Sequence, residues 1–260
     1  MKAMTRMRVD MLLLERGLAE SRSQAQRMVM AGQVRVDGQV VLKPAAQVEP
    51  EAQVEIDQGP PFVSRGGEKL EAALATFMID VGDLVCADVG ASTGGFTDCL
   101  LQNGAARVYA IDVGYGILHW RLRQDERVVV MERTNARYVP SLPEPVRLVT
   151  IDASFISLKV LLPVVKGWFP AAGGQVVALI KPQFEAGKQE VKRGEGVIRD
   201  PAVHRRVVEE VLTFAQENGY EVRGLMRSPL LGPKGNTEFL AWLACPQTEK
   251  RDLQPLLDEI

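Results

Sequence analysis

Residues 86–97 have the sequence Cys86-Ala87-Asp88-Val89-Gly90-Ala91-Ser92-Thr93-Gly94-Gly95-Phe96-Thr97. The apolar start of this segment predicts a buried strand, and its end predicts the first turn of a helix. The glycines between them permit a tight turn in which the backbone can approach a ligand closely. Their order differs from G-x-G-x-x-G, which weakens the alternative of a dinucleotide-dependent dehydrogenase. The segment therefore predicts an α/β domain with a ligand pocket after this strand.

Strand-like and helix-like stretches alternate on both sides of this turn. The strand candidates are Leu84–Val89, Arg107–Ile111, Val128–Met131, Leu148–Ile151, Gln175–Ile180, Glu221–Arg227 and Glu238–Ala244. The helix candidates are Thr97–Asn103, Ser157–Trp168 and Pro201–Asn218, and another helix opens near Gly66. Such alternation predicts a doubly wound, mainly parallel sheet. We therefore expect a Rossmann-like α/β fold with seven strands.

The first 59 residues predict a separate small α+β domain. Apolar residues recur at helical spacing from Val9 to Leu18, and a second helix is expected to end near Met30. The dipeptide Asp37-Gly38 between two short apolar runs is typical of a β-hairpin. The predicted divisions are a domain at 1–59, a linker at 60–67 that contains Pro60-Pro61, and a domain at 68–260.

The charge of the chain is unevenly distributed. Residues 1–43 contain eight lysines and arginines and four acidic residues, which gives +4. The whole chain has a net charge of −2, so the remainder carries −6. A local basic surface on an acidic protein suits a polyanionic partner, although a solvated helix face without a ligand would have the same composition.

Composition excludes several classes of protein. The sequence contains no run of about 18 apolar residues, which a transmembrane helix needs, and its N-terminus lacks the apolar stretch of a signal peptide. Cys86, Cys99 and Cys245 lack the spacing of a zinc site. We therefore expect a cytoplasmic protein with three reduced cysteines, no membrane partner and no metal.

Polar residues follow several of the predicted strands. Asp112 ends the strand after the glycine turn, where a carboxylate can accept hydrogen bonds from a ribose diol. Asp152 and Lys181 end later strands, at the sheet edge where ligands bind in such folds. A lysine at a strand exit can also simply point into solvent, so this motif alone leaves both roles for Lys181.

The N-terminal segment resembles the S4-type RNA-binding domain, which presents two helices and a small hairpin to folded RNA. The resemblance rests on Arg8-Val9-Asp10, Arg16-Gly17, Ser21-Arg22-Ser23 and Gly32-Gln33-Val34-Arg35-Val36-Asp37-Gly38. It implies RNA contacts, mostly to phosphates and to RNA shape, at matching positions. These positions are Arg8, Ser21, Arg22, Ser23, Gln26, Arg27 and Arg35, to which we add Arg65 in the linker.

The glycine turn has the form Asp-x-Gly-x-Ser-x-Gly-Gly-Phe, which resembles the S-adenosylmethionine loop of the FtsJ-like RNA methyltransferases. This resemblance implies that residues 90–96 hold the methionine end of the cofactor, that Asp112 holds its ribose, and that Thr134-Asn135 borders its adenine. The implied cofactor-binding residues are Asp88, Gly90, Ala91, Ser92, Thr93, Gly94, Gly95, Phe96, Asp112, Thr134, Asn135 and Asp152.

Lys69, Asp152, Lys181 and Glu238 match, in order and context, the Lys-Asp-Lys-Glu tetrad of 2′-O-methyltransferases. A ribose hydroxyl is a weak nucleophile that must be aligned with the methyl donor and must lose its proton. We assign Lys181 as the group that orients and deprotonates it. A lysine base needs desolvation or a neighbouring cation, whereas nearby carboxylates favour its charged form. A purely positioning role for Lys181 is therefore an alternative.

Nearly the whole chain, from Arg8 to about Leu243, is similar to the TlyA (hemolysin A) family of rRNA methyltransferases. The signatures are Val63-Ser64-Arg65-Gly66-Gly67-Glu68-Lys69-Leu70, Asp152-Ala153-Ser154-Phe155-Ile156-Ser157, Ile180-Lys181-Pro182-Gln183-Phe184-Glu185-Ala186-Gly187, Gly194-Glu195-Gly196-Val197-Ile198-Arg199-Asp200, and Lys234-Gly235-Asn236-Thr237-Glu238. The family implies S-adenosylmethionine-dependent 2′-O-methylation of cytidine in ribosomal RNA, with rRNA or ribosomal subunits as partners. The basic, glycine-containing loop 185–199, with Lys188, Lys192 and Arg193, closes over RNA or cofactor on one interpretation and is a solvated loop on another.

Two further functions compete with this interpretation. A membrane-lytic protein needs a secreted chain or a strongly amphipathic insertion segment, and the sequence shows neither. A non-catalytic RNA-binding or ribosome-assembly factor would not need the complete tetrad or the glycine turn. Leakage from liposomes would favour the first alternative, and the lack of methyl transfer would favour the second.

Overall fold

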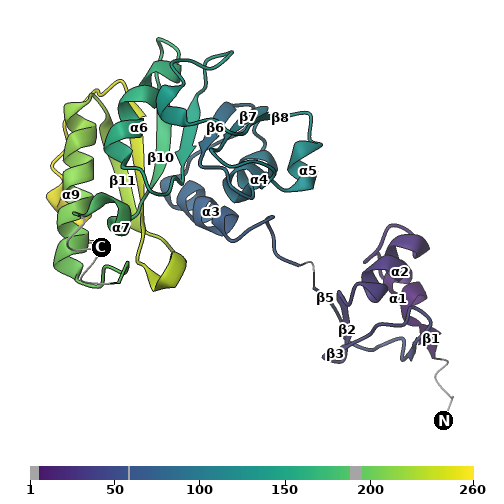
Figure 1. Ribbon diagram of the computed structural model, residues 1–260. Helices are drawn as coiled ribbons and strands as arrows, with labels where there is room; N and C mark the ends of the chain where they lie inside the picture. Colours follow the sequence, from purple (N-terminus) through teal and green to yellow (C-terminus); the bar gives the residue numbers. More distant parts are fainter. Residues whose placement is uncertain (1–5, 58, 188–194) are drawn as a thin grey trace. The chain divides into compact units, whose positions relative to one another are not determined.

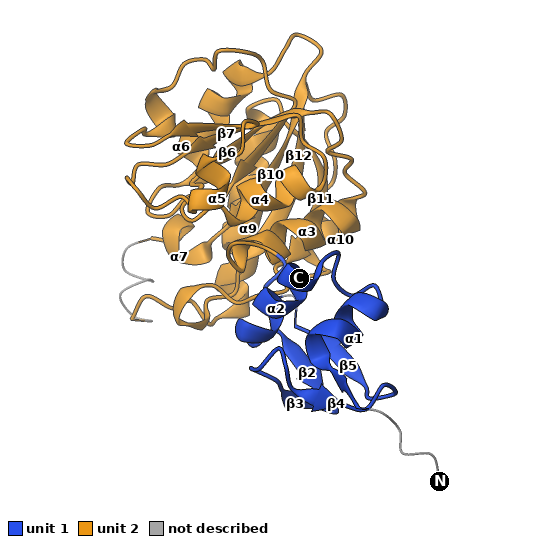
Figure 2. Ribbon diagram, turned by 90° about the vertical axis from the view of Figure 1, so that its right-hand side faces the viewer, with its two compact units in different colours: residues 1–61 blue, residues 62–260 orange. Residues whose placement is uncertain are grey.

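The structure is a computed structural model that describes residues 6–57, 59–187 and 195–260. The chain divides into two compact units, Met1–Pro61 and Phe62–Ile260 (Figure 2). Each unit has a hydrophobic core of its own. We describe the two units one after the other.

The small unit combines two helices with short strands. Its elements are β1 Met7–Arg8, α1 Val9–Glu15, α2 Arg22–Met30, β2 Val34–Val36, β3 Gln39–Val40, β4 Gln47–Val48 and β5 Val54–Ile56. Asp37 and Gly38 both have positive φ, at +50° and +78°, so the predicted two-residue hairpin is present between β2 and β3. Strand β5 pairs with the other side of β2, and β1 pairs with β4. The apolar stripes of the helices pack on this sheet, with Val9, Leu13 and Val29 fully buried.

The large unit contains a seven-stranded sheet in the order β11-β12-β10-β9-β6-β7-β8. Its strands are β6 Val85–Val89, β7 Arg107–Ile111, β8 Val128–Met131, β9 Leu148–Ile151, β10 Gly174–Ile180, β11 Glu221–Arg227 and β12 Phe239–Cys245. The expected Rossmann-like α/β fold is confirmed. The exception to parallel order is β12, which pairs antiparallel with both β10 and β11.

Helices cover both faces of this sheet (Figure 1). They are α3 Gly66–Phe77, α4 Gly95–Gln102, α5 Trp120–Arg123, α6 Leu158–Val165, α7 Pro182–Glu185, α9 Pro201–Glu217 and α10 Gln254–Leu257. One core cluster contains the buried faces of α6 and α9, and another contains those of α3 and α4. With both faces covered, the central strands are mostly apolar, and Asp88 in β6 and Thr150 in β9 are buried polar exceptions.

The structure also differs in detail from the sequence expectations. Helix α3 begins at Gly66, where a helix was expected to open, and so overlaps the segment 60–67 expected as a linker; within that segment Phe62 is buried and Gly67 packs against its ring. The helix expected at 157–168 is divided into α6 and a 3-10 turn, Lys166–Trp168. The two-residue strands β1 and β4 and the four-residue helices α5, α7 and α10 were not expected, since so few residues show no periodicity.

Candidate active site

The glycine-rich turn connects β6 to α4. Gly90, Ser92 and Gly94 have positive φ values of +84°, +51° and +99°, so the chain turns sharply there. A Cβ atom on Gly90 would lie 2.7 Å from the backbone oxygen of Asp152. Glycine at this position therefore lets the turn approach the end of β9 more closely than any side chain would allow.

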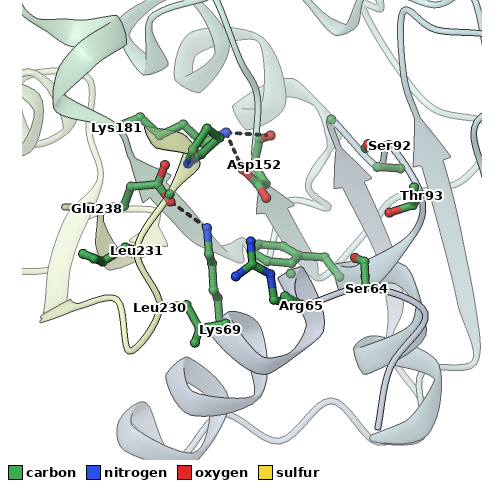
Figure 3. A pocket seen from close by; sticks show the side chains of 17 residues that line it. Ser64, Arg65, Lys69, Ser92, Thr93, Asp152, Lys181, Leu230, Leu231 and Glu238 are labelled. Carbon is green, nitrogen blue, oxygen red and sulfur yellow. Dashed lines mark hydrogen bonds and ion pairs between the residues drawn. The ribbon is translucent and has the colours of Figure 1, made fainter. Parts of the chain in front are cut away.

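A cleft of about 380 Å³ opens beside this turn, and the whole predicted tetrad lines it (Figure 3). Its walls come from the start of α3, the glycine turn, the ends of β9 and β10, and the segment before β12. Four chain segments far apart in the sequence thus bring Lys69, Asp152, Lys181 and Glu238 together. Ser64 and Arg65 line the same cleft, which places the exposed Arg65 in the large unit at its wall.

The tetrad forms two ion pairs. Lys69 Nζ lies 2.6 Å from Glu238 Oε2, and Lys181 Nζ lies 2.5 Å from Asp152 Oδ1 (Figure 3). The carboxylate of Glu238 is fully buried, while the side chain of Asp152 is 24% exposed. A buried carboxylate that loses its cationic partner is strongly destabilising, so Lys69 and Glu238 depend on each other in this position. Asp152 is thus the most accessible member of the tetrad, whereas the side chains of Lys69 and Lys181 are similarly buried, at 11% and 9% exposed.

Two polar residues complete the cluster that the sequence alone did not identify. Lys181 Nζ donates hydrogen bonds to Ser154 Oγ at 3.1 Å and to the backbone oxygen of Asp152 at 3.3 Å. Gln183 Nε2 donates to Glu238 Oε1 at 3.3 Å, and the Gln183 side-chain oxygen is buried without a partner among the described residues. Both belong to the family signatures around Asp152 and Lys181, which is the only signal that could have indicated them.

A second cleft of about 420 Å³ lies on the other side of Gly90 and Asp152. Asp112, Thr134 and Asn135 line it, as the sequence interpretation requires. Asp112 accepts hydrogen bonds from the backbone N–H groups of Ser92, at 2.8 Å, and Gly114, at 2.7 Å. These bonds fix the carboxylate at the mouth of the cleft, and its remaining lone pairs can accept hydrogen bonds from a ligand.

Asp88 and Gly94, two of the predicted cofactor-binding residues, line neither cleft. Asp88 is fully buried and accepts hydrogen bonds from Thr97 Oγ1, at 2.7 Å, and Thr150 Oγ1, at 3.1 Å. It therefore ties α4 and β9 to β6 behind the glycine turn. Gly94 packs against Leu122 and shapes the turn. Gly90, Ala91, Ser92, Thr93, Gly95 and Phe96 do line the first cleft.

The buried Asp88 predicts a pH-dependent stability. Burial raises the pKa of this carboxyl to about 7, against the hydrogen bonds from Thr97 and Thr150. Because the pKa in the folded state is raised, the contribution of Asp88 to stability is fully present below about pH 4 and is lost as the pH rises through about 7. The variant Asp88→Asn cannot ionise at this position. We therefore expect its melting temperature, relative to that of wild type, to be higher at pH 8 than at pH 5.

Thermal unfolding at these two pH values measures the effect. Glu249→Gln, at an exposed site, is the matched control and should show the same difference from wild type at both. A melting-temperature difference between Asp88→Asn and wild type that does not change with pH would contradict the prediction.

In the small unit, three of the predicted RNA-binding residues converge on Asp10. The Arg8 guanidinium donates to both carboxylate oxygens, at 2.9 Å and 2.7 Å, and Gln26 Nε2 donates at 3.0 Å. Arg22 Nε lies 3.4 Å away. Hydrogen bonds from Arg8 hold the pKa of the fully buried Asp10 carboxyl well below its usual range. The sequence interpretation assigned no role to Asp10. In the structure it fixes the cationic side chains of Arg8 and Arg22, together with the amide of Gln26, in one place.

The other predicted RNA-binding residues of this unit are exposed. Ser21 Oγ accepts the backbone N–H of Gln24 at 3.2 Å and caps α2. Ser23, Arg27 and Arg35 are also on the surface. The basic loop residues Lys188, Lys192 and Arg193 lie outside the described residues.

None of the described helices combines the length and the apolar character that a membrane crossing needs. Within the described ranges, histidine, cysteine, aspartate and glutamate side chains do not gather in groups of three or more that could hold a metal ion.

Comparisons with known proteins agree with this geometry. The FtsJ-like methyltransferase family matches residues 62–245, and the S4 domain matches residues 7–54. The 16S/23S rRNA (cytidine-2′-O)-methyltransferase TlyA of Mycobacterium tuberculosis is 48% identical over 242 residues, which are 92% of this chain and 90% of that protein. Hemolysin A of Brachyspira hyodysenteriae is 39% identical over 245 residues, which are 90% of this chain and 98% of that protein.

Solved structures show the same relationship. A protein from Streptococcus thermophilus that carries a hemolysin name has a TM-score of 0.72 and 44% identity, covering 98% of this chain and 96% of its own. A Listeria monocytogenes structure described as an S-adenosylmethionine-dependent methyltransferase, at 15% identity and a TM-score of 0.53, shares the fold of the large unit and covers 72% of this chain and 100% of its own. This chain therefore belongs to the FtsJ-like methyltransferases and, among them, to the TlyA family.

Proposed function

We propose that this protein transfers a methyl group from S-adenosylmethionine to the ribose 2′-hydroxyl of a cytidine in ribosomal RNA. The arrangement of Lys69, Asp152, Lys181 and Glu238 around one cleft beside the glycine turn carries this proposal. The M. tuberculosis relative, named a 16S/23S rRNA (cytidine-2′-O)-methyltransferase, supports the choice of ribosomal RNA and of cytidine.

The residues of the two clefts fit S-adenosylmethionine. The space that a Cβ atom on Gly90 would fill, and the Asp112 carboxylate held by two backbone N–H groups, together suit a nucleoside with a charged tail. We assign residues 90–96 to the methionine end, Asp112 to the ribose diol, and Thr134 and Asn135 to the adenine. When bound, the cofactor supplies a methyl group already activated on a sulfonium, and this transfer does not require a metal.

Lys181 is assigned to the ribose hydroxyl. Its Nζ atom lies among three oxygen acceptors, two from Asp152 and one from Ser154, which hold it in place at the wall of the cleft. This supports an orienting role over a role as base. The ammonium donates a hydrogen bond to the hydroxyl oxygen and stabilises the negative charge that develops there as the proton leaves to water. Lys69 and Glu238 form the wall against which the ribose is positioned.

The small unit is assigned to RNA binding. Asp10 holds Arg8 and Arg22 so that their remaining N–H groups can donate to phosphates, and Arg27 and Arg35 add exposed positive charge. We assign Arg65, at the wall of the active-site cleft, to the RNA near the target nucleotide. A ribosomal RNA substrate places the enzyme in the cytoplasm.

Methylation of isolated ribosomal RNA tests the proposal. Deproteinised rRNA and ribosomal subunits from cells that lack the gene are incubated with purified protein and S-adenosylmethionine, and modified positions are mapped by their resistance to alkaline cleavage. We expect a new 2′-O-methylcytidine. A methyl group found on a base, or no transfer to either substrate, would contradict the proposal, and the second result would favour a non-catalytic assembly factor.

A further inference from the structure

Two loops of the large unit leave the sheet side by side. Strands β7 and β8 are parallel neighbours, with Ile111 paired to Met131, so the loops that follow them start at the same edge of the sheet. The residues that end β9 and β10, Asp152 and Lys181, lie at this edge too. The strand order therefore places the two loops along the edge that holds the clefts, toward the β8 end (Figure 1).

These loops expose large aromatic side chains. Tyr115 is 69% exposed, Trp120 is 63% exposed, and Tyr138 is 70% exposed. Each such side chain buries roughly 150–250 Å² when it is covered, so a partner that covers these rings would gain substantial contact area. The core does not need them, because Leu118, Leu122 and Ala136 from the same segments are the residues that it buries.

Arginines accompany the rings. The Arg133 guanidinium carbon lies 4.1 Å from the ring centroid of Tyr115, and that of Arg137 lies 4.5 Å from the centroid of Tyr138. Cation–π contact of this kind holds a guanidinium flat against the ring and leaves its N–H edge available. Arg121, next to Trp120, is also exposed.

These three arginines carry uncompensated charge. Among the described residues, Arg121, Arg133 and Arg137 have no carboxylate within ion-pair distance, whereas Arg123 pairs with Glu132 and Arg127 with Asp125. The chain beyond residue 43 has a net charge of −6, so this cluster is a local exception. A positive patch on an acidic domain attracts a polyanion such as RNA.

We propose that Tyr115, Trp120, Arg121, Arg133, Arg137 and Tyr138, here called the arginine–aromatic surface, bind an unpaired segment of the substrate RNA. Unpaired bases stack on aromatic rings, and guanidiniums bind the phosphates between them. The inference rests on the proposed function and extends it. The RNA contacts the methyltransferase unit beyond the methylated nucleotide, in addition to its contacts with the small unit.

Two variants of the full-length protein test this surface, one by removing electrostatic contacts and the other by removing base stacking. The double variant Arg121→Gln/Arg133→Gln removes two phosphate contacts. The slope of the logarithm of its affinity for deproteinised rRNA against the logarithm of salt concentration should therefore be smaller in magnitude than that of wild type, by about 1.5. Trp120→Ala removes a stacking platform, so affinity should fall about 5-fold to 100-fold with the salt slope unchanged. Neither variant touches the clefts, so S-adenosylmethionine affinity should equal that of wild type.

The matched control uses the same two strands at their opposite ends. Arg107→Gln/Arg127→Gln removes two arginines that are paired with Glu144 and Asp125 near the starts of β7 and β8, and rRNA affinity should stay near wild type. If both test variants bind rRNA as wild type does, the proposal is wrong. It is equally wrong if they bind naked rRNA normally and lose only ribosomal subunits, because the surface would then contact protein. Failure of the proposed function is separate, since wild type itself would then transfer no methyl group to rRNA.

Discussion

Replacing Lys181 with alanine is expected to reduce methyl transfer at saturating substrates by about 100-fold or more. The variant loses the cation that faces the ribose hydroxyl, together with its contacts to Asp152 and Ser154. Lys181 lines the first cleft together with the glycine turn, but it is absent from the second cleft, where Asp112, Thr134 and Asn135 lie. The contacts assigned to the ribose and adenine of the cofactor therefore remain, and affinity for S-adenosylmethionine should change little. Single-turnover methylation and calorimetric cofactor binding measure the two quantities separately.

Two further variants sharpen this test. Lys159→Ala removes an exposed lysine that is paired with Glu210, and its methyl transfer should match wild type. Lys181→Arg retains the charge and the hydrogen-bond donors but cannot act as a base near neutral pH. Partial activity in this variant would support the orienting role, and activity as low as that of the alanine variant would support the role as base. Wild-type turnover in Lys181→Ala would remove Lys181 from the site.

The strands of the large sheet could be predicted closely from the sequence. Strands β7, β8, β9 and β11 have the expected bounds. The first three are largely apolar runs bounded by polar or turn residues, whereas β11 mixes charged and apolar residues. Their partners could not be predicted in the same way. Strand β12 lies antiparallel between β10 and β11, and this placement depends on pairing between distant segments of the chain. The local sequence pattern does not contain that information.

The site shows the same division. Residue type and order predicted the four members of the tetrad, but the sequence does not show that Lys69 pairs with Glu238 and Lys181 with Asp152. The sequence also could not predict where the side chain of Asp88 lies. Strand β6 is covered on both faces, so the residues on both sides of Asp88 in the sequence are apolar. This pattern therefore does not indicate the face of the sheet toward which the Asp88 side chain points. In the structure it points toward Thr97 and Thr150 rather than into a cleft.

Replacing Gly90 with alanine is expected to weaken S-adenosylmethionine binding by about 10-fold to 100-fold, with loss of methyl transfer in proportion. The new Cβ atom would lie 2.7 Å from the backbone oxygen of Asp152 and 2.9 Å from its carbonyl carbon, so the turn or the end of β9 must move. The φ of +84° adds strain of about 1–2 kcal/mol for any side chain. Both clefts share Gly90 and Asp152, so this movement disturbs the two sites together.

A substitution at a second glycine distinguishes the effect of backbone strain from that of a steric clash. Gly104 has a similar φ of +89°, but its nearest contact for a new Cβ atom would be the Gly82 Cα at 3.5 Å, an ordinary distance. Gly104→Ala should therefore lose stability by about 1–2 kcal/mol and keep wild-type cofactor affinity. If Gly90→Ala behaves in the same way, the close approach of the glycine turn to β9 is not what forms the cofactor site. If only Gly90→Ala loses the cofactor while both variants remain folded, the contact between this turn and Asp152 is what links the methyl-donor cleft to the catalytic tetrad.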